Sequence, residues 1–553
     1  MTRLRHFYHI LSEHIFPWWR SEEKKIAWGG MIALLAMSLI SVYIAVVLNA
    51  WSRDFFNTIE QKDLNAFLHQ VLIFIPLIAI VLFDFCSRNY LTAWLSFRWR
   101  RWSTVRLQTD WLAHKNFYRI ALQTKEMDNP DQRISQDINS VCYAFIGIAL
   151  SFFREGVNFI TFSAILWELS STFDFTFGRY NFNIPGLLVW ASLLYSLLGT
   201  LVTFKVGGPL IELDRLQEKR EANFRYRLMR IFERREEIAT LSGENVEHKG
   251  LNATFKDITE NYYRILKRQI YINLFQNFYM NASMFVPLFL VGPLYFKGVI
   301  TMGVLMQIRG MFSEVNMSLS SIIMEYQGIA SAVASLQRIM TFKQLMKNHE
   351  KSPHHLLPIN SHGIHIPSLH LHTPTGSPIW TSPAFDLKAG DRKILKAPSG
   401  TGKTSLLRML SGIHVHQDGK RLSLGDEAMI IPQRPYMPIG TLKQCLTYPL
   451  DEDTHNTETI ENLMIQCQLK HLMPFLDKVA DYQNRLSLGE QQRINFVRVL
   501  LKKPQWLLMD EPLSSLNHDY AEMVIAALDT SLPKAGILIV SHQDIQGFRP
   551  VSL

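Results

Sequence analysis

Residues 397–404 read Ala397-Pro398-Ser399-Gly400-Thr401-Gly402-Lys403-Thr404. Glycines at this spacing let backbone N–H groups wrap a polyphosphate, and the helix that follows presents its positive end to the same anion. Lys403 then reaches the β- and γ-phosphates, and the hydroxyl of Thr404 is placed to bind Mg²⁺. Ala397 stands where the first glycine of such a loop is usual, and its methyl group is expected to weaken binding without abolishing it. The stretch predicts a site for ATP and Mg²⁺ in an α/β domain.

Two apolar runs farther along the chain end in residues that suit phosphate chemistry. The run 506–509 is followed by Asp510 and Glu511. A carboxylate at a strand end is placed to orient Mg²⁺ in a parallel sheet, so Asp510 is predicted to be that ligand. Glu511 is suited to polarise an attacking water as general base. His542 follows the run 536–540 and is expected to contact the γ-phosphate. Together these residues indicate an ATP hydrolase.

A second anion site is predicted at residues 486–493, which read Leu486-Ser487-Leu488-Gly489-Glu490-Gln491-Gln492-Arg493. Ser487 and Gly489 precede a helical pattern over 491–499, and a helix N-terminus binds phosphate well. Within one domain this motif is expected to face away from the Lys403 site. A second copy of the chain would then supply the opposite phosphate, so a homodimer is expected.

Length and composition indicate a membrane protein with two domains. The chain has 553 residues, of which 48% are hydrophobic and 19% charged. A helix needs about 20 apolar residues to cross the hydrocarbon of a bilayer. Six stretches qualify: 26–50, 70–97, 140–167, 185–210, 270–298 and 302–335. The last is interrupted by Arg309, Glu314 and Glu325.

Charge placement predicts the orientation of these spans. Arginine and lysine are concentrated over 98–133 and 215–268, between the spans. Cytoplasmic connections carry this excess, so both stretches and both chain ends are expected in the cytoplasm. The same placement explains the formal net charge of +9, and no nucleic-acid partner is expected. The four cysteines have no paired spacing that would indicate a disulfide framework or a zinc site.

Ionisable residues inside the predicted spans have two possible roles. Asp84, the pair Arg154-Glu155, Arg309 and Glu314 are the candidates. Such groups are costly in lipid and mark either a transport pathway or a structural ion pair. Sequence alone leaves both open.

A change of composition near residue 343 marks the domain boundary. Apolar periodicity fades there into residues rich in Pro, Ser and His. The predicted organisation is an all-α six-span transmembrane domain at 1–342, a linker at 343–362, and an α/β P-loop ATPase domain at 363–553.

These motifs, in this order, resemble the ATP-binding cassette transporters over nearly the whole chain. The fused membrane and ATPase domains are similar to the half-transporters of subfamily D, and most closely to the bacterial inner-membrane YddA and SbmA/BacA group. Outside the motifs above, the stretches that carry the likeness are Asp128-Asn129-Pro130-Asp131-Gln132-Arg133-Ile134, Glu221-Ala222-Asn223-Phe224-Arg225-Tyr226-Arg227, Glu236-Glu237-Ile238-Ala239 and Pro432-Gln433-Arg434-Pro435-Tyr436.

The resemblance implies further roles. Gln433 is implied to bind Mg²⁺ and sense the γ-phosphate, and His542 to be the switch histidine. Coupling helices are implied near 128–134 and 236–239. The candidate catalytic residues are Glu511, His542 and Lys403, and the candidate Mg²⁺ ligands are Thr404, Gln433 and Asp510. The candidate nucleotide-binding residues are Ala397, Pro398, Ser399, Gly400, Thr401, Gly402, Lys403, Thr404, Ser405, Gln433, Ser487, Gly489 and Glu490.

Three positions depart from the family pattern. Leu488 stands where glycine is frequent. Thr373 stands where an aromatic residue often stacks on adenine, and Trp380 is a candidate substitute. Asn517 replaces the usual aspartate after 514–516, which bears on communication between the two ATP sites.

The expected function is a homodimeric transporter of the bacterial inner membrane that is driven by ATP hydrolysis. Its cargo is expected to be a peptide, a cobalamin-like compound or an acyl amphiphile. Two alternatives stay open: an ion-gradient-driven transporter that the cassette regulates, and a membrane-tethered ATPase without transport.

Overall fold

The structure is a computed structural model that describes residues 15–123, 130–171, 175–177, 180–182, 184–350, 354–356, 359–360, 363–372, 378–396, 401–413, 421–425, 427–513, 518–542 and 544–551. The chain divides into two compact units. One comprises Met1–Leu107 with Asn129–Thr341, and the other Gln108–Asp128 with Phe342–Leu553. Residues 108–123, which the sequence assigns to the membrane domain, thus pack with the second unit.

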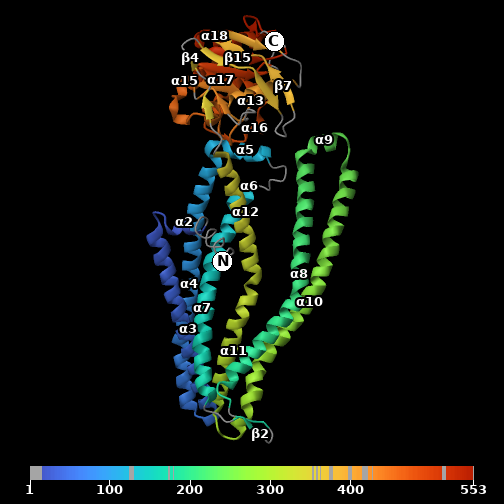
Figure 1. Ribbon diagram of the computed structural model, residues 1–553. Helices are drawn as coiled ribbons and strands as arrows, with labels where there is room; N and C mark the ends of the chain where they lie inside the picture. The colour runs from blue at the N-terminus through green and yellow to red at the C-terminus, as the bar shows by residue number, and fades with distance from the viewer. Residues whose placement is uncertain are drawn as a thin grey trace. The chain divides into compact units, whose positions relative to one another are not determined.

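Long helices make up the first unit (Figure 1). In chain order they are α2 (Phe16–Trp19), α3 (Lys24–Gln61), α4 (Leu64–Leu112), α7 (Ile138–Ser171), α8 (Leu187–Glu233), α9 (Arg235–Thr240), α10 (Glu244–Phe296), α11 (Met302–Met324) and α12 (Tyr326–Glu350). The ends of α4 and α12 extend into the second unit. A short hairpin, β1 (Phe175–Phe177) and β2 (Tyr180–Phe182), lies between α7 and α8.

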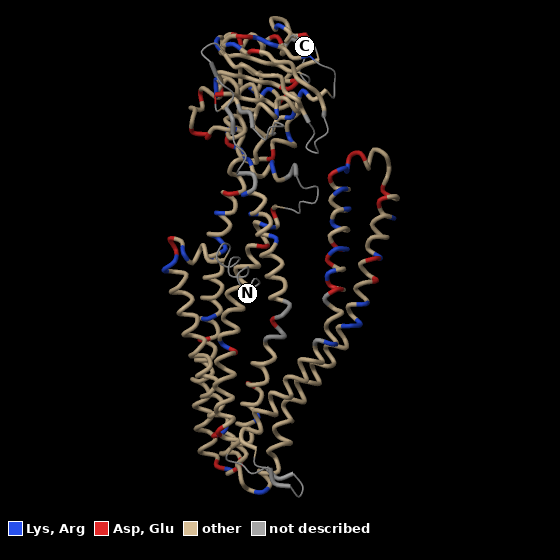
Figure 2. Tube along the Cα trace, in the orientation of Figure 1, with Lys and Arg blue, Asp and Glu red and all other residues tan. Residues whose placement is uncertain are grey.

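Five helices of the described chain are long and apolar enough to cross a membrane. They contain the predicted spans 26–50, 70–97 and 140–167 and nearly all of 185–210 and 270–298. The sixth predicted span, 302–335, is not among the five; it corresponds to α11 and the start of α12, which are separated by a single turn residue, Glu325. Figure 2 shows many charged residues along the upper parts of α8 and α10 as drawn, and few along their lower parts.

Close packing joins α8, α10 and α11. Gly199 of α8 lies so near α10 that a Cβ there would approach Tyr279 to 2.2 Å. Tyr279 stacks on Tyr195, with ring centroids 4.6 Å apart, and donates a 2.6 Å hydrogen bond to Asn316 of α11. Buried apolar residues of α7, α8, α10 and α11 form the core beside this contact: Phe162, Leu166, Leu188, Val291, Ile308 and Val315.

A buried ion pair holds the start of α7. Arg133 lies in a short π-type turn (Arg133–Asp137), and its Nη1 donates to Asp137 at 2.6 Å. The two side chains are only 7% and 6% exposed. Arg338 of α12 adds a second donor at 2.5 Å from Asp137, but it is 42% exposed. Asp137 therefore links the turn to α12.

The second unit contains a five-stranded parallel sheet in the order β11-β14-β15-β9-β16. Its strands are β9 (Arg392–Leu395), β11 (Ala428–Ile431), β14 (Trp506–Asp510), β15 (Gly536–Val540) and β16 (Arg549–Pro550). Strands β14 and β15 are buried along their whole length, as apolar runs covered on both faces of a parallel sheet should be. The predicted α/β fold class is confirmed.

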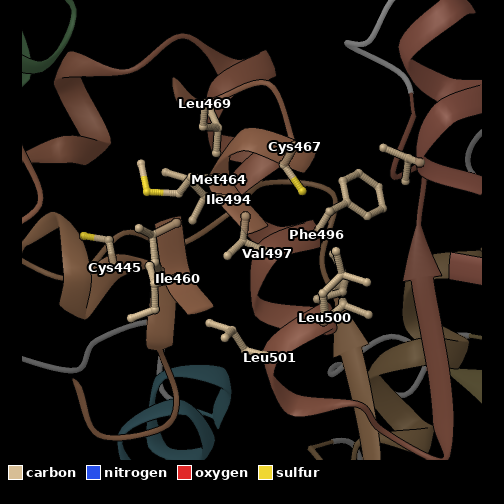
Figure 3. Close-up of a cluster of buried hydrophobic side chains, with 14 of the residues drawn as sticks. Cys445, Ile460, Met464, Cys467, Leu469, Ile494, Phe496, Val497, Leu500 and Leu501 are labelled. Atoms are coloured by element: carbon tan, nitrogen blue, oxygen red, sulfur yellow. The ribbon is translucent and has the colours of Figure 1, made fainter. Parts of the chain in front are cut away.

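Alternate residues of the central strands enter two cores. Leu508 and Leu538 pack with α13 (Lys403–Leu410) on one face. Leu507 and Ile537 pack on the other face with α15 (Thr457–Gln466), α17 (Leu488–Lys502) and α18 (His518–Ser531). Figure 3 shows the second core, where side chains of α15 and α17 interdigitate. Because successive side chains of a strand point to opposite faces, each central strand contributes to both cores.

Smaller elements complete this unit. The antiparallel strands are β4 (Ile359–Asn360), β5 (Gly363–Ile366) and β8 (Phe385–Leu387) in one sheet and β6 (Leu369–His372) with β7 (Pro378–Ser382) in another. Two pairs are β3 (His354–Leu356) with β10 (Arg421–Ser423) and β12 (Gly440–Thr441) with β13 (Val479–Ala480). The short helices are α5 (Asn116–Gln123), α14 (Leu442–Thr447) and α16 (Tyr482–Arg485).

Candidate functional site

The neighbouring strands β14 and β15 end at the same edge of the sheet and place three of the predicted residues there. Asp510, the last residue of β14, is in register with Val540 at the end of β15. Glu511 follows with a φ of 46°, and its backbone N–H donates to Val540 O at 2.8 Å. His542 lies two residues after β15. The carboxyl edge of a parallel sheet is where ligands bind in such folds.

The side chains at this edge are joined by hydrogen bonds. Lys403 Nζ lies 3.2 Å from the ring nitrogens of His542, and His542 Nε2 lies 2.7 Å from Glu511 Oε1. Gln433 Nε2 donates to Glu511 Oε2 at 3.0 Å. Thus the structure brings together, from four segments, residues that are up to 139 positions apart in sequence.

A second contact unites two predicted Mg²⁺ ligands. The hydroxyl of Thr404 donates to Asp510 Oδ2 at 2.7 Å. Gln433 uses its amide N–H on Glu511, which leaves its carbonyl oxygen as a donor atom for a metal. Hydroxyl, carboxylate and amide oxygens are the ligands that Mg²⁺ prefers, so the three residues fit this ion.

Burial shifts the pKa of two charged groups in the site. It lowers the pKa of Lys403, which Glu511 and Asp510 oppose by attraction. It also raises the pKa of Asp510, against a lowering by the Thr404 hydrogen bond. Both directions mean that the site disfavours an isolated charge. A bound metal and triphosphate would supply the missing countercharges.

Part of the phosphate loop lies in the described chain. Gly402 has a φ of +100°, a conformation that favours glycine, and it caps the N-terminus of α13. A Cβ there would approach Ile379 to 2.8 Å. Thr401, Lys403, Thr404 and Ser405 are also described, whereas Ala397, Pro398, Ser399 and Gly400 lie outside the described residues. Thr373 and Asn517 lie outside them too.

The predicted second anion site forms the N-terminus of α17. Ser487 is the N-cap residue: its hydroxyl accepts from the N–H of Glu490 at 3.3 Å and donates to Glu490 Oε2 at 2.7 Å. Glu490 Oε1 lies 2.7 Å from His471 Nε2. Burial acts to raise the pKa of Glu490, but the hydrogen bonds from His471 and Ser487 outweigh it and lower the pKa. Leu488, next to Ser487, is exposed.

Substituting Glu490 by glutamine tests this cap. Glutamine also serves in a capping box, but it carries no charge. At neutral pH we expect a loss of about 1 kcal/mol of folding stability, because a charge-assisted hydrogen bond is replaced by a neutral one. The pKa of Glu490 in the folded protein lies below its usual value of 4.5. The stability loss should therefore have its full size at pH values above 4.5, and it should vanish as the pH falls through the folded pKa. The Tm difference between variant and wild type, followed from neutral pH to about 4, measures it. A constant difference would contradict the pKa shift.

Sequence reasoning missed Arg498, which positions the segment around Gln433. The Arg498 side chain donates to the backbone carbonyls of Cys445 at 2.8 Å and Tyr436 at 2.9 Å, and to Asn495 Oδ1 at 2.9 Å. Burial lowers the pKa of Arg498 to about 10. Cys445 and Tyr436 lie 53 and 62 positions away and accept through backbone carbonyls, so no local sequence pattern indicates this role. Arg498 fixes the end of the segment 432–436 on α17.

Replacing Arg498 by methionine should destabilise the second unit. The variant removes the donor to the buried carbonyl of Cys445 and to the partly buried carbonyl of Tyr436, at a cost of about 2–3 kcal/mol. In a unit of this size that corresponds to a Tm about 5–10 °C lower. Lys502→Met, on the same helix but partly exposed, should change stability by less than about 0.5 kcal/mol. Equal Tm values for the two variants would contradict the role of Arg498.

The predicted coupling segments lie in different parts of the structure. Residues 236–239 lie in α9, a short exposed helix between α8 and α10. Residues 130–134 pack within the first unit. The upstream segment 108–128 instead joins the second unit, where Lys115 Nζ donates to Ser411 O, at the end of α13, at 2.9 Å. The coupling roles of 128–134 and 236–239 stay predictions.

Three of the predicted intramembrane charges, Arg154, Glu155 and Glu314, belong to a polar network between α7 and α11. Arg154 Nε donates to Glu155 at 3.0 Å, which is an ion pair within one helix. Asn158 of α7 donates to Glu314 of α11 at 2.9 Å, and Ser318 of α11 donates to Glu155 at 3.1 Å. Of the two roles that the sequence left open for these residues, a transport pathway or a structural ion pair, the contacts support the structural one.

Comparisons with known proteins agree with this organisation. The family model of ABC transporter transmembrane region 2 matches residues 11–296, and the ABC transporter model matches residues 381–514. The inner membrane ABC transporter ATP-binding protein YddA of Escherichia coli (strain K12) is 32% identical, over 95% of this chain and 93% of that protein. ABC transporter D family member 2, chloroplastic, of Arabidopsis thaliana is 30% identical, over 98% of this chain and 84% of that protein.

A solved structure is similar in fold. The structure of a bacterial Atm1-family ABC exporter with ATP bound superposes with a TM-score of 0.71, over 94% of this chain and 91% of that chain. The sequence identity is 16%, so the likeness concerns the fold alone.

Proposed function

The chain belongs to the ABC transporters, and from this premise we propose that two copies of it form an ATP-driven transporter of the bacterial inner membrane. The ATPase domain of this family hydrolyses ATP. In the proposed dimer each copy contributes its six predicted spans and one ATPase domain, with both chain ends in the cytoplasm.

The observation that carries this proposal is that the phosphate-binding residues form two separate clusters. Lys403, Glu511 and His542 contact one another at the sheet edge. Ser487 instead contacts Glu490, which contacts His471. Each cluster adjoins a helix N-terminus that suits an anion, yet neither supplies a complete site. A two-fold axis would place the partner's Ser487 opposite Lys403 and so complete both sites at once.

Within each site the residues have distinct proposed roles. Lys403 and the N-terminus of α13 bind the phosphates. Thr404, Asp510 and Gln433 hold Mg²⁺, and this ion screens the negative charge of the phosphates. Glu511 takes the proton of the attacking water. The 2.7 Å contact with His542 and the 3.0 Å contact with Gln433 hold the Glu511 carboxylate in place. Gly489 and Glu490 support the anion site that Ser487 opens.

The proposed cargo is a peptide, a cobalamin-like compound or an acyl amphiphile. Similarity to YddA over 95% of the chain supports the inner membrane as location. ATP binding would close the ATPase domains, and helices such as α4 and α8, which extend beyond their apolar parts, would transmit that closure.

A complementation experiment tests the shared sites. Purified Lys403→Ala and Ser487→Arg chains should each be inactive as homodimers. Mixed dimers regain one intact site, because one chain supplies Lys403 and the other supplies Ser487. Half of randomly formed dimers are mixed, so ATPase activity should recover to at most roughly a quarter of wild type.

A matched control distinguishes this result from simple dilution. The double variant Lys403→Ala/Ser487→Arg, mixed with wild type, carries one lesion into each shared site and should form mixed dimers without activity. Wild-type activity of the Ser487→Arg chain on its own would show that each chain hydrolyses ATP alone, and would contradict the shared sites.

A further inference from the structure

A stripe of asparagines runs along α10, at the start of the predicted membrane span 270–298. Asn273, Asn277 and Asn281 are spaced four residues apart, so they lie on one helix face. All three are exposed. Asn277 donates to Asn273 O at 2.9 Å and Asn281 to Asn277 O at 2.8 Å, so these two amides each use one N–H on their own helix. A second N–H and the carbonyl oxygen of each remain for another partner.

The exposed side of α10 has two different faces. At 100° per residue, Leu274, Phe278, Phe285 and Phe289 share one face, and all four are exposed apolar residues that suit lipid. The asparagines share the adjacent face with Met280 and Met284, which are 41% and 39% exposed. The remaining side packs on α8 and α11, through Tyr279 for instance. Because lipid offers carboxamides no hydrogen bonds, the asparagine face is unsuited to the hydrocarbon.

We propose that this asparagine face lines the transport path and binds the backbone of an extended, uncharged peptide. The inference rests on the proposed transport function and selects one of its cargo classes. Residues four apart on a helix are separated by about 6 Å. Alternate residues of an extended chain are separated by about 6.6 Å, so three asparagines match three alternate peptide groups.

The chemistry of the face also favours a peptide. A carboxamide donates and accepts at once, as does a peptide group, so each asparagine can pair with one. An acyl chain offers no such partner and would leave the three side chains unsatisfied. Met280 and Met284 are flexible and polarisable, and they adapt to peptide side chains of different shape.

Thiol labelling tests the water-filled path. In a Cys86→Ser background only three cysteines remain, all buried. Asn273→Cys, Asn277→Cys and Asn281→Cys are introduced singly, with Phe278→Cys as control on the apolar face. The full-length protein, in vesicles, is treated with a charged methanethiosulfonate. We expect rapid labelling at the asparagine positions and slow labelling at the control, since the reagent requires a hydrated thiolate.

Protection by ligand tests the peptide. An uncharged hexapeptide should slow labelling of Asn277→Cys, and the same peptide with N-methylated backbone amides should not. Adding Asn281→Leu should weaken the protection about fivefold, the equivalent of one hydrogen bond. Labelling no faster than at Phe278→Cys, or a disulfide between copies at position 277, would overturn the proposal. Protection by acyl-CoA or cobalamin but not by the peptide would overturn the cargo. Neither readout needs ATP hydrolysis, so failure here is distinct from failure of the ATP-driven dimer.

Discussion

Replacing Glu511 by glutamine should lower kcat for ATP hydrolysis by about 10²–10⁴-fold, the usual contribution of a general base. Glutamine has nearly the same shape and can keep contacts to His542 and Gln433, which lie 2.7 Å and 3.0 Å from the carboxylate. It cannot accept the proton of the attacking water. Binding of Mg·ATP should remain close to wild type, because Lys403, Thr404 and Asp510 are unchanged.

Single-turnover hydrolysis and equilibrium ATP binding measure these two effects separately. Glu458→Gln is the matched control: it makes the same chemical change in the same domain, at an exposed position in the first turn of α15, and it should keep both ATP binding and hydrolysis. In vesicles, Glu511→Gln should also abolish transport. Hydrolysis within tenfold of wild type would mean that the base is another residue, and undiminished transport would refute the ATP-driven mechanism.

The sequence predicted those parts of the site that local motifs encode. Asp510 and Glu511 follow an apolar run, and that run is the central strand β14. The lysine of the phosphate loop begins α13, as the loop pattern requires. The resemblance to ABC transporters with a fused membrane region is confirmed by the matching families. Motifs of this kind are local. Because each one lies at the end of a strand or at the start of a helix, that element places its residues in the site.

What the sequence missed depends on contacts between distant residues. Arg498 donates to the backbone carbonyl of Tyr436, 62 positions away. Every residue has a backbone carbonyl, so the sequence does not indicate which one accepts from Arg498. Lys115 contacts Ser411 across 296 positions, and no motif in the sequence indicated that contact.

Replacing Asp137 by asparagine should have the largest effect on stability in the first unit. It leaves the buried Arg133 without its carboxylate, and removing one partner of a buried ion pair costs about 3–5 kcal/mol. The Tm of the purified full-length protein should fall by roughly 6–15 °C. Arg338→Ala should cost less than about 1 kcal/mol, because this partner is 42% exposed and Asp137 keeps Arg133.

The double variant Arg133→Met/Asp137→Leu separates charge from packing. If the penalty of Asp137→Asn arises from an uncompensated buried guanidinium, removing both charges should recover most of the lost stability, since apolar residues of similar volume replace such pairs at little cost. A double variant as unstable as Asp137→Asn would place the penalty in the lost bond between Asp137 and Arg338 of α12. In that case Arg338→Ala must destabilise as strongly as Asp137→Asn. That result would contradict the expectation of a small effect, which follows from the exposure of 42% for Arg338 compared with 7% for Arg133.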